Sequence, residues 1–193
     1  LESRGYRVAI LPRPDHRSAE DFRRFGRPRL GFLINSGVVD SMVNNYSVFK
    51  HRRKKDEYAP GGQAGGRPDR ALIVYCNRAR EAYKGVPVVI GGIEASLRRL
   101  GHYDYWSGKV RRSVLLDSKA DLLIYGMGER AVVEIAEALD AGIDIKDIHW
   151  IKGTCYRSSL PPEDEETILL PDYDEIIRSK RRYAESFAVQ FKN

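Results

Sequence analysis

The sequence is poor in cysteine and contains no long apolar run. It has 2 cysteines among 193 residues, Cys76 and Cys155, and they are 79 positions apart. This spacing fits no metal-binding or redox motif, and isolated thiols are typical of a cytoplasmic protein. Because no stretch of about 18 uninterrupted apolar residues occurs, we expect no membrane partner.

Several catalytic signatures are also absent. The sequence contains no serine nucleophile elbow, no phosphate-binding P-loop and no pair of metal ligands at a recognised spacing. These absences argue against the common hydrolase and nucleotide-hydrolysing classes. With 42% hydrophobic and 31% charged residues, the chain instead has the composition of a folded globular domain.

Positive charge is plentiful, and it is concentrated in one window. The formal net charge is +6, and residues 50–70 alone hold seven Lys or Arg against three acids. Such a window permits an anionic partner. Residues 35–67 lack a hydrophobic period, and a loop of that length is usually either functional or disordered. Both interpretations are open at this point.

Short apolar runs alternate with helical patterns along the chain. We expect strands at residues 6–11, 29–34, 86–90, 122–125 and 148–151, and helices at residues 18–25, 68–83, 94–100 and 130–141. Continuous apolar strands between helices are typical of a parallel sheet that is covered on both faces. The sequence therefore predicts an α/β, Rossmann-like fold with a parallel sheet and helices on both faces.

The two ends of the chain differ from its middle. Residues 1–5 resemble the last turn of a helix with its glycine cap, so we expect the natural N-terminus, with a first strand, to lie upstream. Residues 160–166 form an acidic linker, and a charged helix follows at residues 173–187. We therefore expect a Rossmann-like domain over residues 1–159 and a linker with a C-terminal helical extension over residues 160–193.

Ligands of a parallel sheet bind beyond the carboxyl ends of its strands. The loops at residues 35–45, 91–96 and 126–129 each follow an expected strand, so we expect them to gather on one rim. Residues 126–131 also fit the G-x-G-x-x-G/A form of dinucleotide-binding turns, which would suit a nicotinamide-dependent enzyme. Because the motif follows the third or a later strand, a tight strand-to-helix turn is the simpler interpretation.

Polar aromatic residues cluster at residues 102–106, where they could stack on a base or form a buried plug. Together with the basic loop at residues 50–70, this cluster makes a nucleotide- or RNA-binding module the alternative function. Four arginines flank the cluster and could bind phosphates or serve as surface charges: Arg98, Arg99, Arg111 and Arg112.

Seven segments of the sequence carry a family resemblance. They lie at residues 40–46, 65–70, 91–99, 102–107, 110–113, 117–121 and 125–129. In this order they resemble the N-terminal region of the YgiQ-like radical SAM proteins. The resemblance implies a cobalamin-binding-like domain ahead of a catalytic domain, whose C-x-x-x-C-x-x-C motif holds a 4Fe-4S cluster and S-adenosylmethionine in the full-length protein.

The sequence departs from that pattern in its cofactor ligands. Two cysteines cannot supply the three-cysteine motif, and residues 147–149 are followed by Lys152 where a cobalamin-binding motif needs glycine. We therefore expect no cofactor and no catalytic residue in this chain, and a radical SAM domain of the same polypeptide as its partner. The resemblance implies that one set of rim residues faces that domain or its substrate: Asn44, Asn45, Gly91, Gly92, Glu94, Ser96, Asp104, Trp106, Gly126, Gly128 and Glu129.

Overall fold

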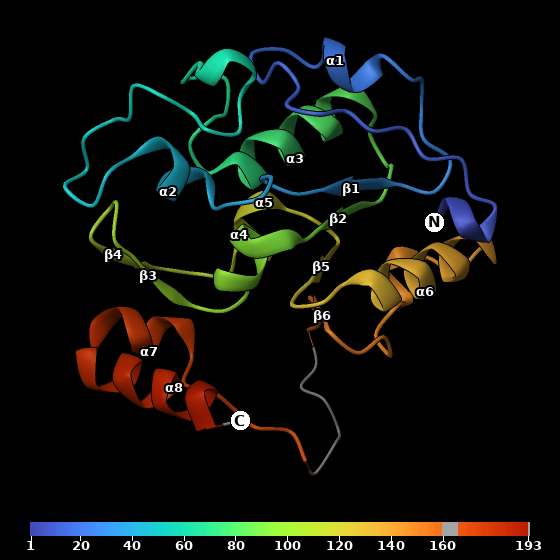
Figure 1. Cartoon of the computed structure of the whole chain (residues 1–193). Coiled ribbons are helices and arrows are strands. Elements are labelled where there is room, and N and C mark those ends of the chain that lie inside the picture. The colour runs from blue at the N-terminus through green and yellow to red at the C-terminus, as the bar shows by residue number, and fades with distance from the viewer. Residues whose placement is uncertain (160–165, 193) are drawn as a thin grey trace.

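The computed structural model describes residues 1–159 and 166–192. Its main sheet has four strands in the order β1-β2-β5-β6 (Figure 1). The strands β1 (Phe32–Ile34), β2 (Val88–Ile90) and β5 (Leu122–Ile124) run parallel, and β6 (Thr154–Tyr156) is an antiparallel edge strand. The Rossmann-like α/β fold is confirmed, and the antiparallel edge strand is an addition to it.

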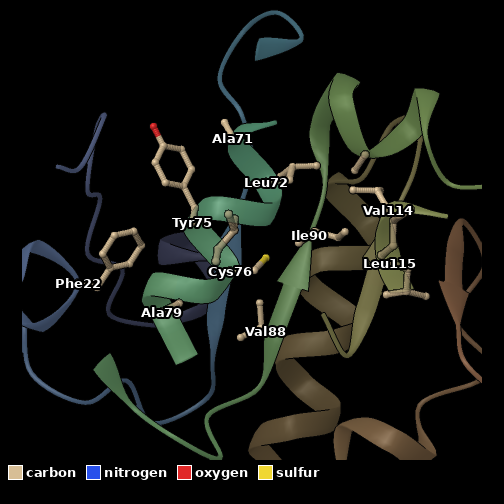
Figure 2. Close-up of a cluster of buried hydrophobic side chains, with 13 residues drawn as sticks. Phe22, Ala71, Leu72, Tyr75, Cys76, Ala79, Val88, Ile90, Val114 and Leu115 are labelled. Atoms are coloured by element: carbon tan, nitrogen blue, oxygen red, sulfur yellow. The ribbon is translucent and has the colours of Figure 1, made fainter. Parts of the chain in front are cut away.

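Helices cover both faces of this sheet. Successive residues of a strand point to opposite faces, and every residue of β2 and β5 is apolar and buried, so both faces need a cover. One apolar cluster joins the strands to α3 (Ala71–Ala82) and α5 (Val114–Ser118) around Ile90 (Figure 2). A second cluster joins the opposite face to α6 (Glu129–Asp140) around Leu122. The expected covering of both faces is therefore confirmed.

Two of the expected strands are wrong. Residues 6–11 form no strand, and Ile10 is 77% exposed. The segment at residues 148–151 is buried at both ends, yet it follows the 3-10 turn η3 (Ile145–Asp147) without pairing. An apolar run becomes a strand only where a neighbouring strand accepts its backbone hydrogen bonds, and neither segment has that neighbour.

Residues 35–70 have defined structure despite their lack of a hydrophobic period. They contain α2 (Ser41–Asn45) and the 3-10 turn η2 (Pro60–Gly62). Two isolated β-bridges, Tyr46 with Arg52 and Lys55 with Gln63, fold the basic window back on itself. The expected helix at residues 68–83 begins at Ala71, after Arg70 has taken a left-handed conformation.

An antiparallel hairpin of β3 (His102–Asp104) and β4 (Lys109–Arg111) lies beside the segment that follows α2 (Figure 1). No pattern in the sequence predicted this hairpin. The chain reaches the hairpin from α4 (Gly92–Leu97), which follows β2. We call residues 35–70 together with this hairpin the cap.

The remaining helices lie toward the two ends of the chain. At the N-terminus, η1 (Glu2–Arg4) ends at Gly5 in a left-handed conformation, and α1 (Glu20–Arg23) lies within the expected helix. After the acidic linker, of which residues 160–165 lie outside the described part of the chain, α7 (Tyr173–Arg178) and α8 (Lys180–Lys192) form a pair. None of the described helices is long and apolar enough to cross a membrane.

Candidate functional site

The three loops that follow β1, β2 and β5 meet at the carboxyl edge of the sheet. Ser96 ties two of them together, because its Oγ accepts a hydrogen bond from the Gly126 amide at 3.1 Å and donates one to Gly92 O at 2.9 Å. Gly92 also lies against the loop after β1, since a Cβ at this position would be 3.2 Å from Asn35 Cβ. The three loops therefore form one rim, as expected from the order of strands and loops in the sequence.

Backbone conformation and packing explain why glycine occupies positions 126 and 128. Gly126 has φ +66, and a Cβ at Gly128 would lie 2.8 Å from Ile124 Cγ2. Left-handed backbone favours glycine, and close packing on β5 excludes a larger residue at the second position. Glu129 is exposed in the first turn of α6, where its carboxylate complements the helix dipole.

Glu94 is a predicted rim residue that the fold buries. Its side chain is almost fully buried, and its carboxylate accepts hydrogen bonds from the amides of Ser41 at 2.8 Å and Leu72 at 3.3 Å. These amides belong to the first turns of α2 and α3, where backbone N–H groups lack partners within their helix. Glu94 therefore holds two helix starts against α4.

The asparagines of the rim also act within the protein. Asn45 is buried, and its side-chain amide donates to Arg67 O at 3.1 Å and to Asp69 Oδ1 at 2.8 Å. Asn44 is buried beside it and donates to Asn45 Oδ1 at 3.4 Å. The two residues join α2 to the stretch that leads into α3, so they fix the shape of the cap.

Asp104 anchors the hairpin to the rest of the cap. Its carboxylate is buried and forms an ion pair with Arg70 at 2.6 Å, and it accepts a hydrogen bond from the Ser107 hydroxyl. Burial raises the pKa of Asp104, but the hydrogen bonds from Ser107 and Arg70 lower it by a larger amount. The pKa of Asp104 therefore lies below its ordinary value. Asp104 therefore stays ionised as an internal anchor.

The aromatic cluster packs against the basic window. The Trp106 ring lies 5.5 Å from that of Tyr46 and 5.3 Å from that of Tyr105. Lys50 lies 4.7 Å from the centre of the Tyr105 ring and donates to Trp106 O at 3.4 Å, and Arg52 lies over Tyr46 at 5.2 Å. These aromatic residues and cations therefore interact with one another, and Trp106 is half-buried among them.

The flanking arginines are likewise occupied by internal partners. Arg98 pairs with the buried Asp40, and burial lowers the pKa of Arg98. Arg99 lies 5.1 Å from the centre of the Tyr125 ring. Arg111 and Arg112 both bind Asp117, at 2.8 and 2.6 Å. From the sequence, all four could have been phosphate contacts or surface charges; the two carboxylates that neutralise three of them, Asp40 and Asp117, were not predicted.

Exposed apolar side chains on the rim loops were also missed. Val38 follows β1, Leu97 lies on α4, and Met127 follows β5; they are 74%, 60% and 85% exposed. Apolar residues directly after predicted strands were the available signal. Because these residues lie on the three loops that meet at this edge, the rim exposes apolar as well as polar groups.

The cysteines do not fit an iron–sulfur cluster within this chain. Such a cluster needs three thiolates, and the chain has two cysteines. Burial raises the pKa of Cys76 to about 12 and also raises that of Cys155. No group of three His, Cys, Asp or Glu side chains in residues 1–159 and 166–192 could hold a metal ion, and the exposed His149 ring stacks on Tyr156 at 4.3 Å.

Comparison with known proteins places the chain in a family. Residues 1–193 match the family described as Radical SAM N-terminal, and the chain belongs to it. It is 58% identical over 192 residues to UPF0313 protein CPE1196 of Clostridium perfringens strain 13, and 50% identical over 193 residues to UPF0313 protein CLJ_B0249 of Clostridium botulinum strain 657. The chain spans 29% and 30% of the lengths of these relatives. No solved structure matches it.

Proposed function

We propose that this chain is the accessory, substrate-side domain of a radical SAM enzyme. The observation that carries the proposal is the rim, where the loops after three parallel strands converge and expose apolar side chains. Family membership and the much greater length of the relatives support a catalytic part elsewhere in the polypeptide. Residues 1–159 would form the accessory domain, and residues 160–193 would lead to that part.

The full-length protein would hold a 4Fe-4S cluster and S-adenosylmethionine, which supply radical chemistry when bound. The residues of this chain would position the substrate and exclude water. Ser96, Trp106, Gly126 and Glu129 would face the substrate or the catalytic part. The buried set of Asn44, Asn45, Glu94 and Asp104 would hold these residues in place, because precise placement of a reacting group requires rigid support. The unpaired cysteines agree with action in the cytoplasm.

The test uses the full-length protein, purified without oxygen and reconstituted with iron and sulfide. We expect the visible absorption of an iron–sulfur cluster and reductive cleavage of S-adenosylmethionine. Trp106→Ala and Glu129→Gln should lower the cleavage rate roughly tenfold, because misplacement of reacting groups is costly. Cluster content should stay unchanged in both variants, and the melting temperature should stay unchanged in Glu129→Gln, whose side chain is exposed.

Trp150→Ala is the matched control, since Trp150 is 59% exposed and precedes the edge strand β6 outside the rim loops. Its cleavage rate should equal that of the unmodified protein. Cleavage that is equally fast in the two rim variants and the control would overturn the substrate-side assignment. A full-length protein that binds no cluster would overturn the enzyme assignment itself.

A further inference from the structure

The last helix carries an apolar stripe that the described residues leave exposed. Ala184, Phe187, Ala188 and Phe191 recur at helical spacing on α8, and all four are exposed. Phe187 is 60% exposed and Phe191 is 83% exposed. Residues three and four apart share one face of a helix, so these side chains form a continuous strip, which we call the α8 stripe.

Contacts on its other side fix the orientation of α8. The Tyr183 hydroxyl accepts a hydrogen bond from the Tyr103 amide at 2.9 Å, and Ser186 is buried. Arg182 binds Glu175 of α7 at 2.8 Å and Glu185 of its own helix at 2.8 Å. These contacts use the side of α8 that faces the protein, so the α8 stripe points away from it.

The α7–α8 pair is firmly seated on the cap hairpin (Figure 1). Ile176 is buried against Gly101, where an added Cβ would lie 2.5 Å from Ile176 Cδ1. The Tyr173 hydroxyl donates to Val110 O at 3.4 Å. A body bound to α8 would therefore be held in a fixed relation to the hairpin that carries Asp104 and Trp106.

We propose that the α8 stripe is the docking surface for the part of the full-length protein that follows residue 193. The proposal rests on the proposed function, since it assigns that part as the partner. Two observations favour this occupant: the chain belongs to a family described as Radical SAM N-terminal, and it spans only 29% of the length of its relative from Clostridium perfringens. A partner joined directly to the helix acts at high effective concentration, so a short apolar strip suffices to bind it.

Hydrogen exchange of the full-length protein tests the docking. We expect the amides of residues 183–191 to be protected, and the double variant Phe187→Gln Phe191→Gln to exchange there at least roughly tenfold faster, because it lacks the two phenylalanines that docking would bury. Phe187→Leu should keep the protection. Phe25→Gln is the matched control, because Phe25 is 59% exposed and follows α1. Equal exchange in the double variant and the unmodified protein would overturn the proposal.

Light scattering of the same samples tests whether a second copy of the protein, and not the rest of the same chain, covers the α8 stripe. A full-length protein that is a dimer, and that becomes a monomer in the double variant, would assign the stripe to a second copy and overturn docking within one chain. Cleavage of S-adenosylmethionine is read independently. If the double variant loses the protection of α8, docking is confirmed. If the unmodified protein binds a cluster and cleaves S-adenosylmethionine, the enzyme assignment also holds. A full-length protein that binds no cluster would contradict the enzyme assignment and leave the docking result unaffected.

Discussion

The sheet and the cap are held together by different interactions. The centre of the sheet consists of apolar side chains that are completely buried, such as Ile90 and Leu123. The cap is held by buried polar groups, of which Asp40, Glu94 and Asp104 each bind partners distant in the chain. Apolar burial is non-directional, whereas each of these carboxylates needs particular donors at particular positions.

We therefore expect the cap to lose its geometry more easily than the sheet does. A sheet that rests on many apolar contacts loses a share of its stability at each substitution. A cap that rests on a few directional contacts loses its geometry when one of them is removed, since a buried group left without its partner is costly. Substitutions in the two regions should therefore separate global stability from local structure.

The largest effect is expected for Leu123→Ala in the sheet. Leu123 is completely buried in the cluster between β5 and α3, and truncation of such a side chain costs about 2–5 kcal/mol in the free energy of unfolding. Urea unfolding of the 193-residue chain, followed by circular dichroism, measures the loss. Leu169→Ala, at 76% exposure, should change this free energy by less than about 0.5 kcal/mol; similar losses in both would contradict the assigned core.

Glu94→Gln should have a smaller global effect and a sharper local one. The neutral amide has one oxygen, so one of the two helix-start amides loses its acceptor and the other keeps only an uncharged one, at about 1.5–3 kcal/mol. The amides of Ser41 and Leu72 should exchange faster than those of the sheet, as measured by NMR. Glu137→Gln on the exposed side of α6 is the control. Uniformly faster exchange across the sheet would show that Glu94 supports the whole fold.

The fold could be predicted because its signals are local. The apolar runs of β2 and β5 and the periodicity of α3 and α6 are contained within short segments. The hairpin could not be predicted, because the residues of β3, His102 to Asp104, do not alternate between apolar and polar side chains. Its strands are held by partners far along the chain, Arg70 at Asp104 and Tyr183 at the Tyr103 amide, and no local pattern reveals such partners.

The rim could be located from the sequence, but the roles of its residues could not. The topology of parallel strands brings the loops at Gly92, Ser96 and Gly126 together. Polar residues in those loops were expected to face a ligand. Glu94 instead binds Ser41, which is 53 positions away. Helix starts need acceptors for their amides, and the sequence does not indicate which carboxylate will supply them.

Gly101→Ala tests the seat of the helical pair on the cap. The new Cβ would meet Ile176 Cδ1 at 2.5 Å, and overpacking of this kind costs about 1–3 kcal/mol. Ile176→Val removes that terminal carbon, so the double variant should recover much of the loss. A double-mutant cycle by urea unfolding gives the coupling. If the two losses simply add, Ile176 does not occupy the space beside Gly101.

Asp104→Asn should give the smallest effect, and one that depends on pH. The pKa of Asp104 lies below its ordinary value, because the hydrogen bonds from Ser107 and Arg70 outweigh burial. The folded protein therefore binds the proton more weakly than the unfolded chain does. The stability that this carboxylate contributes is present above the ordinary pKa and is lost as the pH falls through the lowered one.

The unmodified chain should thus exceed the variant by about 1 kcal/mol at neutral pH. This difference should shrink below about pH 4, near the ordinary pKa of aspartate. Urea unfolding of both proteins between neutral pH and that range measures it. Because both proteins share every other acid-sensitive group, subtracting their stabilities isolates Asp104. A difference that stays constant with pH would mean that the ionised carboxylate does not hold the hairpin, and that the cap, like the sheet, depends on packing.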